Sequence, residues 1–265
     1  MDIVTIFKHS RHEDFELRHS LRSIERHAPY IRKVWIFGDR PSFIADDTSL
    51  IEHVPEEYTA LLLGLRPPVR NMFLLLVLSS LIPDLAFEYL FFCDDFYLLK
   101  DYPIEEARTD RYLEDLTPES PKPRGRGLWK DNLWRTRDLL IRLGYPAFNF
   151  EAHVPMYLTR KRVLEAYREF RNFITEDRFF GIMGVSAILN YALKHEKGAS
   201  RPPIVCVKSE ASRGGFWGRP PLTYEAVLHE AEGKKFFNFD DDAFCPVIAR
   251  FLQERFPHPS KYEKG

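Results

Sequence analysis

The sequence predicts a three-layer α/β fold whose central sheet is mostly parallel. Within the first hundred residues, patterns for strand, helix, strand, strand, helix and strand follow one another, which implies a parallel sheet with right-handed crossovers. The expected strands are short, continuous apolar runs, typical of strands buried on both faces. The 265 residues, 45% of them hydrophobic, suffice for one large domain or for a domain with an elaborated subdomain.

The elements of the first half follow from apolar spacing and from turn residues. Leu17, Leu21 and Ile24 fall mostly on one side of a helix, and Pro29 marks the exit from it. Pro83 stops a second helical pattern. In chain order we expect a strand at Asp2–Phe7, a helix at Glu13–His27, strands at Val34–Phe37 and Leu50–Val54, a helix at Val69–Leu81 and a strand at Phe87–Cys93.

The second half begins with a loop. Residues from Pro118 to Gly127 are rich in Pro, Gly and basic side chains, so we divide the domain into two halves, 1–117 and 118–265. The second half is expected to complete the sheet and to build a wall over the first. Its elements are a helix at Trp129–Leu143, a strand at Pro155–Leu158, a helix at Arg160–Phe170, a helix that Thr175 caps and that runs to Leu193, strands at Ile204–Val207 and Lys235–Phe239, and a helix at Ala243–Arg255.

Composition limits the class of protein. The 38 Lys and Arg residues nearly balance 39 Asp and Glu, so the net charge of −1 neither favours nor excludes an anionic partner. Cys93, Cys206 and Cys245 have no metal-type spacing and cannot all pair, which favours a reducing compartment. The start of the chain has no signal-peptide anatomy, and the longest apolar stretch, Met72–Leu78, is too short to span a bilayer. We therefore expect a soluble cytoplasmic protein without a membrane span.

Two adjacent carboxylates, Asp94 and Asp95, directly follow the apolar strand that ends near Cys93. Open α/β sheets bind ligands at the carboxyl ends of their strands, so both side chains are expected at that edge. Carboxylates this close repel each other unless a cation or hydrogen bonds offset the charge, and a hard divalent ion that carries a substrate phosphate would do so. The alternative is a turn in which one Asp caps a loop and the other is solvated.

Four segments carry a more specific signal through their order and spacing. They are Glu16–Pro29 running on to Val34–Asp39, Cys93–Phe96, His153–Pro155 followed by Arg160–Leu164, and Phe256–Ser260 with Glu263. Together they resemble conserved blocks of the Stealth proteins, a family of hexose-1-phosphate transferases that includes capsule-building enzymes and the lysosomal-targeting N-acetylglucosamine phosphotransferase. Small bacteriophage proteins, generally described as glycosyltransferases, share this pattern at this size.

The resemblance implies a GT-A-like three-layer sandwich, in which residues 1–117 bind a nucleotide-sugar donor and residues 118–265 form the acceptor side. Two departures bear on the reaction. The first block, a strand that ends in Trp-Val-Asp-Gly in the family, is reduced here to Ile3–Ser10, and Cys93 stands where the family usually has Asn. Three functions are therefore kept: a metal-dependent glycosyltransferase, a hexose-1-phosphate transferase that releases nucleoside monophosphate, and a non-catalytic nucleotide- or nucleic-acid-binding module.

The same resemblance assigns a metal site. Asp94 and Asp95 would hold Mn²⁺ or Mg²⁺ to neutralise the diphosphate leaving group of a nucleotide sugar, foremost a UDP-sugar. His153 would be a third ligand, because imidazole suits Mn²⁺, or else a general base. The alternative for His153 is a structural histidine.

The candidate donor-binding residues lie in the first half. Asp39 ends the second strand, where nucleotide-binding sheets place an acid on the ribose or base, although Gly-Asp-Arg-Pro is also ordinary turn sequence. Arg22 would face a phosphate, or else pair with Glu25 along the helix. Arg70 and Asn71 begin a helix, a natural anion site, but the two prolines before them also mark an ordinary helix start.

Glu176 and Asp177 are a second pair of catalytic candidates. Inverting GT-A enzymes often place their general base at the start of a helix beyond the acceptor strand, and the predicted helix after Thr175 has this pair in its first turn. First-turn acids are also ordinary, because they complement the helix dipole. Arg178 resembles an arginine after the third family block and would bind phosphate, which competes with the first assignment for the same segment.

The acceptor side is predicted from basic and aromatic residues that alternate between positions 122 and 137. Arg124, Arg126, Trp129, Lys130 and Trp134 are the candidates, helped by Lys122, Arg135 and Arg137. Such interleaving suits a polyanion whose bases or sugar rings stack, so DNA with hydroxymethylated pyrimidines is one candidate acceptor and a glycan is another. In the alternative, the tryptophans anchor an amphipathic helix and the charges are solvated. Arg213–Arg219 would be a second, mobile loop of this kind.

Overall fold

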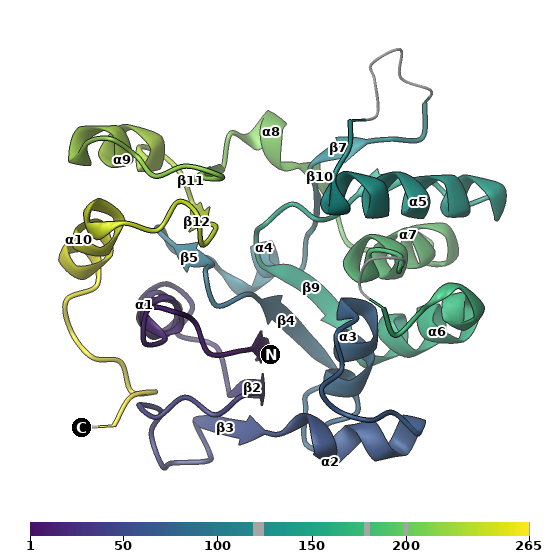
Figure 1. Cartoon of the computed structure of the whole chain (residues 1–265), viewed down its shortest axis with the longest axis horizontal. Helices are drawn as coiled ribbons and strands as arrows, with labels where there is room; N and C mark the ends of the chain where they lie inside the picture. Colours follow the sequence, from purple (N-terminus) through teal and green to yellow (C-terminus); the bar gives the residue numbers. More distant parts are fainter. Residues whose placement is uncertain (119–124, 178–180, 199–200, 265) are drawn as a thin grey trace.

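A five-stranded sheet forms the centre of the computed structural model, which describes residues 1–118, 125–177, 181–198 and 201–264. Its strands, in spatial order, are β3 (Ile51–Val54), β2 (Val34–Gly38), β1 (Asp2–Phe7), β4 (Glu88–Phe92) and β9 (Met156–Thr159) (Figure 1). The first four are parallel, whereas β9 runs antiparallel to β4. The predicted mostly parallel sheet is confirmed, and the second half of the chain contributes a strand to it.

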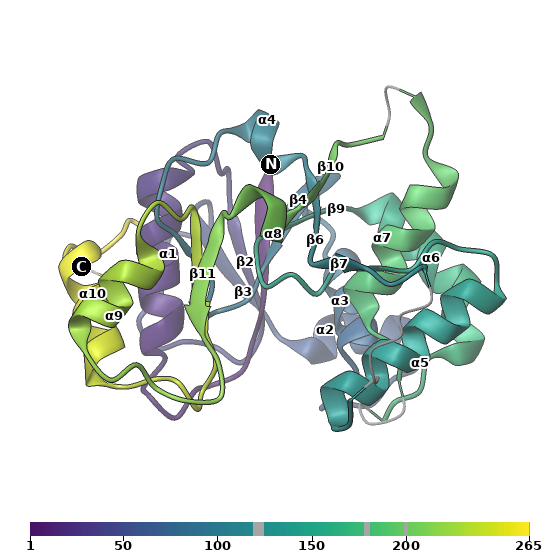
Figure 2. The ribbon, with the colours of Figure 1, turned by 90° about the horizontal axis from the view of Figure 1, so that it is seen from above.

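Helices cover both faces of this sheet and complete three layers. Figure 2 shows α1 on one side of the strands and α3, α6 and α7 on the other. Their bounds are α1 Phe15–His27, α3 Met72–Ser80, α6 Arg160–Phe170 and α7 Gly184–His195. Val4, Ile36 and Leu90 on the central strands are fully buried, as expected for strands whose apolar runs face helices on both sides.

A smaller sheet lies beyond α1. It consists of β11 (Arg213–Phe216), β12 (Phe236–Phe239) and β5 (Tyr97–Leu98), and α9 (Tyr224–Ala231) and α10 (Pro246–Arg255) pack around it (Figures 1 and 2). Tyr97, Phe237 and Phe251 belong to its separate apolar core. Because β5 comes from residues 1–117 and β12 from residues 118–265, the two halves interleave. The expectation of a mobile loop at Arg213–Arg219 is wrong for its first four residues, which form β11.

The remaining elements in the described part of the chain include α5 and β10, which were expected, and several short elements that the sequence patterns did not predict. They are α2 Glu56–Ala60, the 3₁₀ turn η1 Leu61–Leu63, α4 Ile104–Ala107, β6 Asp110–Tyr112, β7 Glu114–Asp115, α5 Leu128–Arg142, β8 Phe148–Asn149, the 3₁₀ turn η2 Arg171–Phe173, β10 Ile204–Cys206 and α8 Val207–Glu210. β10 pairs in parallel with β6, and β7 pairs antiparallel with β8. The three cysteines are unpaired. Among the described residues, no helix has the length and apolar character needed to cross a membrane.

One predicted helix starts in the wrong place. α7 begins at Gly184, not after Thr175, whose hydroxyl donates a hydrogen bond to the carbonyl oxygen of Asp177 at 2.8 Å. Glycine favours this start, because a Cβ at position 184 would stand 2.8 Å from the Cα of Phe73, so its absence lets α7 approach α3. Glu176 and Asp177 therefore lie outside any helical turn, and the first-turn argument for them is wrong.

Candidate active site

The carboxyl ends of β1, β2 and β4 meet the start of antiparallel β9 at one edge of the sheet, and cavities follow this edge. One of about 600 Å³ includes Asp39, one of about 540 Å³ includes His153, and a smaller one of about 200 Å³ includes Glu176. Arg70 lines all three. The three cavities, which share Arg70, form a cleft lined by predicted donor residues, by His153 and by Trp129, at the place where open α/β sheets bind ligands. Asp94 and Asp95 line none of the three.

Asp94 and Asp95 form the turn between β4 and β5 and lie in an acidic neighbourhood. Burial raises the pKa of Asp94, and the charges of Glu16 on α1 and Asp241 after β12 raise it further. Burial also raises the pKa of Asp95, with Asp94 as the next cause. Glu16 is itself buried; its Oε2 accepts a hydrogen bond from Ser10 at 2.8 Å, while its Oε1 has no partner in the described part of the chain.

These carboxylates suit a hard divalent cation in their chemistry. Within residues 1–118, 125–177, 181–198 and 201–264, no three His, Cys, Asp or Glu side chains stand together as a ready metal site. The fit rests instead on uncompensated charge, because Asp94 and Asp95 offer oxygen ligands and the buried Oε1 of Glu16 lacks a donor. A cation held there would offset repulsion that backbone hydrogen bonds at Asp94 and Asp95 relieve only in part.

His153 lies three residues before the start of β9, and its ring lies against the same turn. Its ring packs edge-on to Phe96, with 6.5 Å between ring centroids, and its backbone adopts a left-handed φ of 52°. Burial lowers the pKa of His153 to about 4, helped by the positive charge of Arg213, whose Nη1 donates to the carbonyl oxygen of Ala152. The imidazole is therefore neutral at pH 7, which is the form that binds metals.

The donor-side cavity combines an acid with two cations. Asp39 accepts a hydrogen bond from the backbone N–H of His9 at 3.0 Å and lines the 600 Å³ cavity together with Lys8 and Arg70. Lys8 and Arg70 are exposed and form no hydrogen bond or ion pair with the described residues. An acid beside unpaired cations matches the ribose and the diphosphate of a nucleotide.

Asn71 has a structural task at the same edge. Its Oδ1 accepts hydrogen bonds from the backbone N–H groups of Phe73 and Leu74 at 2.9 and 3.2 Å, which caps the N-terminus of α3. The residue is buried, yet it lines the 540 Å³ cavity beside Arg70. Asn71 therefore fixes the position of Arg70 at the start of α3.

Arg22 does not join the cleft. Its Nε and Nη2 donate to the two carboxylate oxygens of Glu263 at 2.8 and 2.9 Å, and its Nη1 donates to the carbonyl oxygen of Phe256. The alternative partner, Glu25, instead accepts hydrogen bonds from the backbone N–H of Lys261. Arg22 thus holds the C-terminal segment on α1, and two of the segments that resemble the Stealth family are joined by this ion pair.

The remaining candidates separate into two groups. Glu176 lines the 200 Å³ cavity with Arg66 and Arg70, whereas Asp177 lines none of the cavities at this edge. Arg178 and Arg124 lie outside the described residues.

The tryptophans of α5 face different environments. Trp129 is 37% exposed and lines the 540 Å³ cavity, and the amine of Lys130 lies 4.9 Å from its ring centre. Trp134 packs against the main apolar core, as the structural alternative predicted for both. Arg126 and Lys130 are exposed.

Known structures resemble this chain over nearly its whole length, whereas no protein-family model and no curated protein sequence matches it. The galactosyltransferase LgtC, solved with donor and acceptor sugar analogues, aligns with a TM-score of 0.50 at 16% identity and covers 98% of this chain and 96% of its own. An active-site mutant of LgtC gives 0.46 at 14% identity over 96% and 95%. Apo mouse xyloside xylosyltransferase 1 gives 0.44 at 10% identity over 92% and 99%.

The chain has a GT-A fold. At this level of identity the likeness to the LgtC complex extends to the fold and no further, so the chemistry rests on the residues of this chain.

Three residues at the edge of this GT-A sheet were missed from the sequence. Glu16 and Asp241 influence the pKa of Asp94, and Glu151 lines the cavity of His153. Glu151 lies two residues before His153, inside a stretch where the sequence drew attention only to His-Val-Pro. The signals for Glu16 and Asp241 were absent, because an acid in a helix or after a strand is ordinary and only the tertiary fold brings these two to Asp94.

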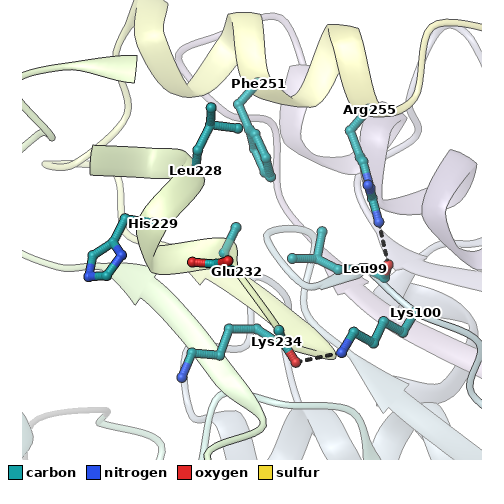
Figure 3. A pocket seen from close by; sticks show the side chains of 10 residues that line it. Leu99, Lys100, Leu228, His229, Glu232, Lys234, Phe251 and Arg255 are labelled. Atoms are coloured by element: carbon teal, nitrogen blue, oxygen red, sulfur yellow. Dashed lines mark hydrogen bonds between the residues drawn. The ribbon is translucent and has the colours of Figure 1, made fainter. Parts of the chain in front are cut away.

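A further cavity of about 530 Å³ lies away from this edge, between α9, α10 and the end of β5. Figure 3 shows Lys100 and Arg255 at this cavity, each bound to a backbone carbonyl, at 2.7 Å from Gly233 and 2.6 Å from Leu99 respectively. It contains none of the predicted site residues. Because Lys100 and Arg255 are bound to backbone carbonyls, these two side chains help to hold the small sheet and its helices together.

Proposed function

We propose that this protein is a divalent-metal-dependent glycosyltransferase that moves a sugar from a nucleotide-sugar donor, foremost a UDP-sugar, to a hydroxyl group of an acceptor. The observation that carries the proposal is the position of Asp94 and Asp95, in the turn after β4 at the edge of a GT-A sheet, beside the Phe96 ring against which His153 packs. The nearby charges of Glu16 and Asp241 add to the demand for a cation.

In this proposal the donor binds in the cavity of about 600 Å³ and the acceptor in the cavity of about 540 Å³. Asp39 accepts hydrogen bonds from ribose hydroxyls or the base, while Lys8 and Arg70 face the diphosphate of the donor. Asp94 and Asp95 hold Mn²⁺ or Mg²⁺, which supplies positive charge against the departing nucleoside diphosphate. The acceptor enters the cavity of about 540 Å³, beside the neutral imidazole of His153.

A thermal-shift screen of nucleotide sugars with and without Mn²⁺ tests the donor half. A donor that binds the folded protein raises the melting temperature by mass action, and this rise should require the metal. Asp95→Asn should abolish the metal-dependent rise while the protein stays folded. A rise of equal size without metal would count against the assignment of Asp94 and Asp95.

A sugar-1-phosphate transferase is the second candidate. The contact of Arg22 with Glu263 favours it, because it unites two segments that resemble the Stealth family. Attack at the anomeric carbon releases nucleoside diphosphate, whereas attack at phosphorus releases nucleoside monophosphate. Product analysis with a radiolabelled UDP-sugar therefore decides between them, and UMP as the sole product would eliminate glycosyl transfer. Full biological activity of Asp95→Asn would instead favour the non-catalytic binding module.

A further inference from the structure

The cavity of about 540 Å³ carries a carboxylate that the proposed reaction has not used. Glu151 lies in the loop between β8 and β9 and lines this cavity with His153, Trp129 and Arg70. Its charge also raises the pKa of the Cys93 thiol, although burial and the pair at positions 94 and 95 contribute more, so Glu151 stands near the end of β4.

One oxygen of Glu151 is fixed and the other is available. Oε1 accepts hydrogen bonds from the backbone N–H and the hydroxyl of Ser186 at 3.1 and 3.2 Å, in the first turn of α7. Oε2 has no partner among the described residues and is not sealed from solvent. In the described part of the chain no Lys, Arg or His forms an ion pair with Glu151. Oε2 of Glu151 is thus a hydrogen-bond acceptor without an ion-pair partner in the described part of the chain, and the contact of Oε1 with Ser186 fixes its position in the cavity.

The opposite part of the lining is apolar and aromatic. Trp129, Leu128 and Met72 are 37%, 39% and 44% exposed, and all three line the cavity. An aromatic face with a negative quadrupole attracts the weakly positive C–H groups of a sugar ring, while a carboxylate accepts hydrogen bonds from its hydroxyls. A lining of large apolar surface with few placed polar groups is typical of sites for uncharged small ligands.

Two of the basic residues of α5 are held by other parts of the chain, whereas Lys130 is exposed. Arg135 donates to Asn132 Oδ1 at 2.8 Å and to the carbonyl oxygen of Gly181, and Arg137 donates to the carbonyl oxygen of Leu116 at 3.1 Å. Their donors are used to hold α5 in place. A nucleic-acid phosphate that entered the cavity would meet Arg70 at one place and the carboxylate of Glu151 at another, and its contact with Glu151 is repulsive.

We propose that Glu151 determines acceptor specificity: its free carboxylate oxygen binds a hydroxyl of an uncharged glycan and disfavours a phosphate-bearing acceptor such as DNA. This inference rests on the proposed glycosyl transfer. Glu151 is a positioning residue for the acceptor in the cavity of about 540 Å³, whereas Asp39 lines the cavity of about 600 Å³, and Arg70 lies between the two. Its contact with Ser186 keeps the oxygen in one place, so little ordering is needed when the acceptor binds.

Glu151→Gln is the discriminating variant. The Gln side-chain carbonyl can still accept from Ser186, so α7 keeps its N-terminal partner, but the charge and the second acceptor oxygen are lost. Because a hydrogen bond to a charged group contributes about 1.5–3 kcal/mol, we expect kcat/KM for a glycan acceptor to fall about tenfold to a hundredfold. Glu225→Gln is the matched control, since Glu225 is an exposed acid in the first turn of α9, and it should change nothing.

The experiment measures two rates on each protein with a UDP-sugar and Mn²⁺. Donor hydrolysis without acceptor reports the proposed function, and transfer to an array of uncharged glycans, with duplex DNA containing hydroxymethylcytosine in parallel, reports the inference. We expect Glu151→Gln to lose glycan transfer while donor hydrolysis and melting temperature stay unchanged. Preferred transfer to DNA, no transfer to any uncharged glycan, or an equal loss of hydrolysis in the variant would overturn the inference. Absence of donor turnover in the wild type would refute the proposed function itself.

Discussion

The sequence predicted that Arg22 binds a phosphate, whereas the structure places it in an ion pair with Glu263. Mutation of Arg22 therefore tests whether this residue has a structural role or a ligand-binding role. Glu263 is 2% exposed at its side chain and Arg22 13%. The carboxylate receives five hydrogen bonds, two from Arg22, one from Arg18 at 3.2 Å, and two from the backbone and hydroxyl of Ser260. Burial by itself raises the pKa of Glu263, but the hydrogen bonds from Arg22 and Ser260 outweigh it and lower the pKa.

Arg22→Met removes two of these five donors and leaves the buried carboxylate with Arg18 and Ser260. Removing one partner of a buried ion pair costs about 3–5 kcal/mol, and because Arg18 remains we expect about 2–3 kcal/mol. For a chain of this size that loss corresponds to a melting temperature lower by roughly 4–12 °C. Adding Glu263→Gln should recover part of the loss, because no buried charge is then left without its partner.

Urea denaturation followed by circular dichroism measures the stability, and a thermal-shift titration with UDP-sugar and Mn²⁺ measures donor affinity. Donor affinity should be unchanged in Arg22→Met. Arg250→Met is the control, since its ion pair with Glu254 is exposed and solvent-screened and its loss should leave the urea midpoint unchanged. Unchanged stability together with weakened donor binding would refute the structural role and restore the sequence prediction.

Three further changes test other parts of the structure. Asp94→Asn should stabilise the metal-free protein by about 1–2 kcal/mol in urea, because it relieves repulsion from Glu16. The same variant should lose the Mn²⁺-dependent thermal shift. A metal-free variant less stable than wild type would contradict this prediction. Burial lowers the pKa of His19 to about 4. The neutral form of His19 therefore contributes to the free energy of unfolding above about pH 6.5, and this contribution is lost as the pH falls towards 4. Over that pH range, urea denaturation should show that His19→Gln loses about 3 kcal/mol less of its free energy of unfolding than wild type. Parallel pH curves would exclude a role for His19. Gly184→Ala should cost about 1–3 kcal/mol because its Cβ would approach Phe73, and a variant as stable as wild type would show that α7 can shift freely.

The sequence predicted the main sheet well and the small sheet poorly, for a physical reason. The strand at Asp2–Phe7 was predicted to the residue because a continuous apolar run records burial on both faces. β11 contains Gly214 and Gly215, which were taken as signs of a loop. A Cβ at Gly214 would stand 2.3 Å from the carbonyl oxygen of Glu230, so this glycine serves close packing of α9 and not a turn. Composition alone does not distinguish these two uses of glycine.

In the candidate site, too, residues could be predicted where neighbouring sequence determines their position, but not where contacts between distant parts of the chain determine it. The carboxylates of Asp94 and Asp95 could be placed because their position after a buried strand is a local property, and the rule for open α/β sheets then gives the edge. Asp39, Arg70 and Trp129 were found for similar local reasons and do line the cleft. Arg22 lies in a segment that resembles the Stealth family, but such a resemblance does not say whether a side chain contacts a ligand or another part of the chain.

The acidic residues near Asp94 lower the stability of the folded protein at the candidate site. Glu16 is buried with one oxygen unpartnered, although a hydrophobic or amide side chain there would fold at lower cost, and the exposed Asp241 adds a further negative charge. The sequence could not reveal this, since each acid is ordinary where it stands in the chain. The acids at this strand end come from α1, from the turn after β4 and from the segment after β12, so the negative charge that would favour a cation there is a property of the tertiary arrangement rather than of the Asp-Asp pair alone.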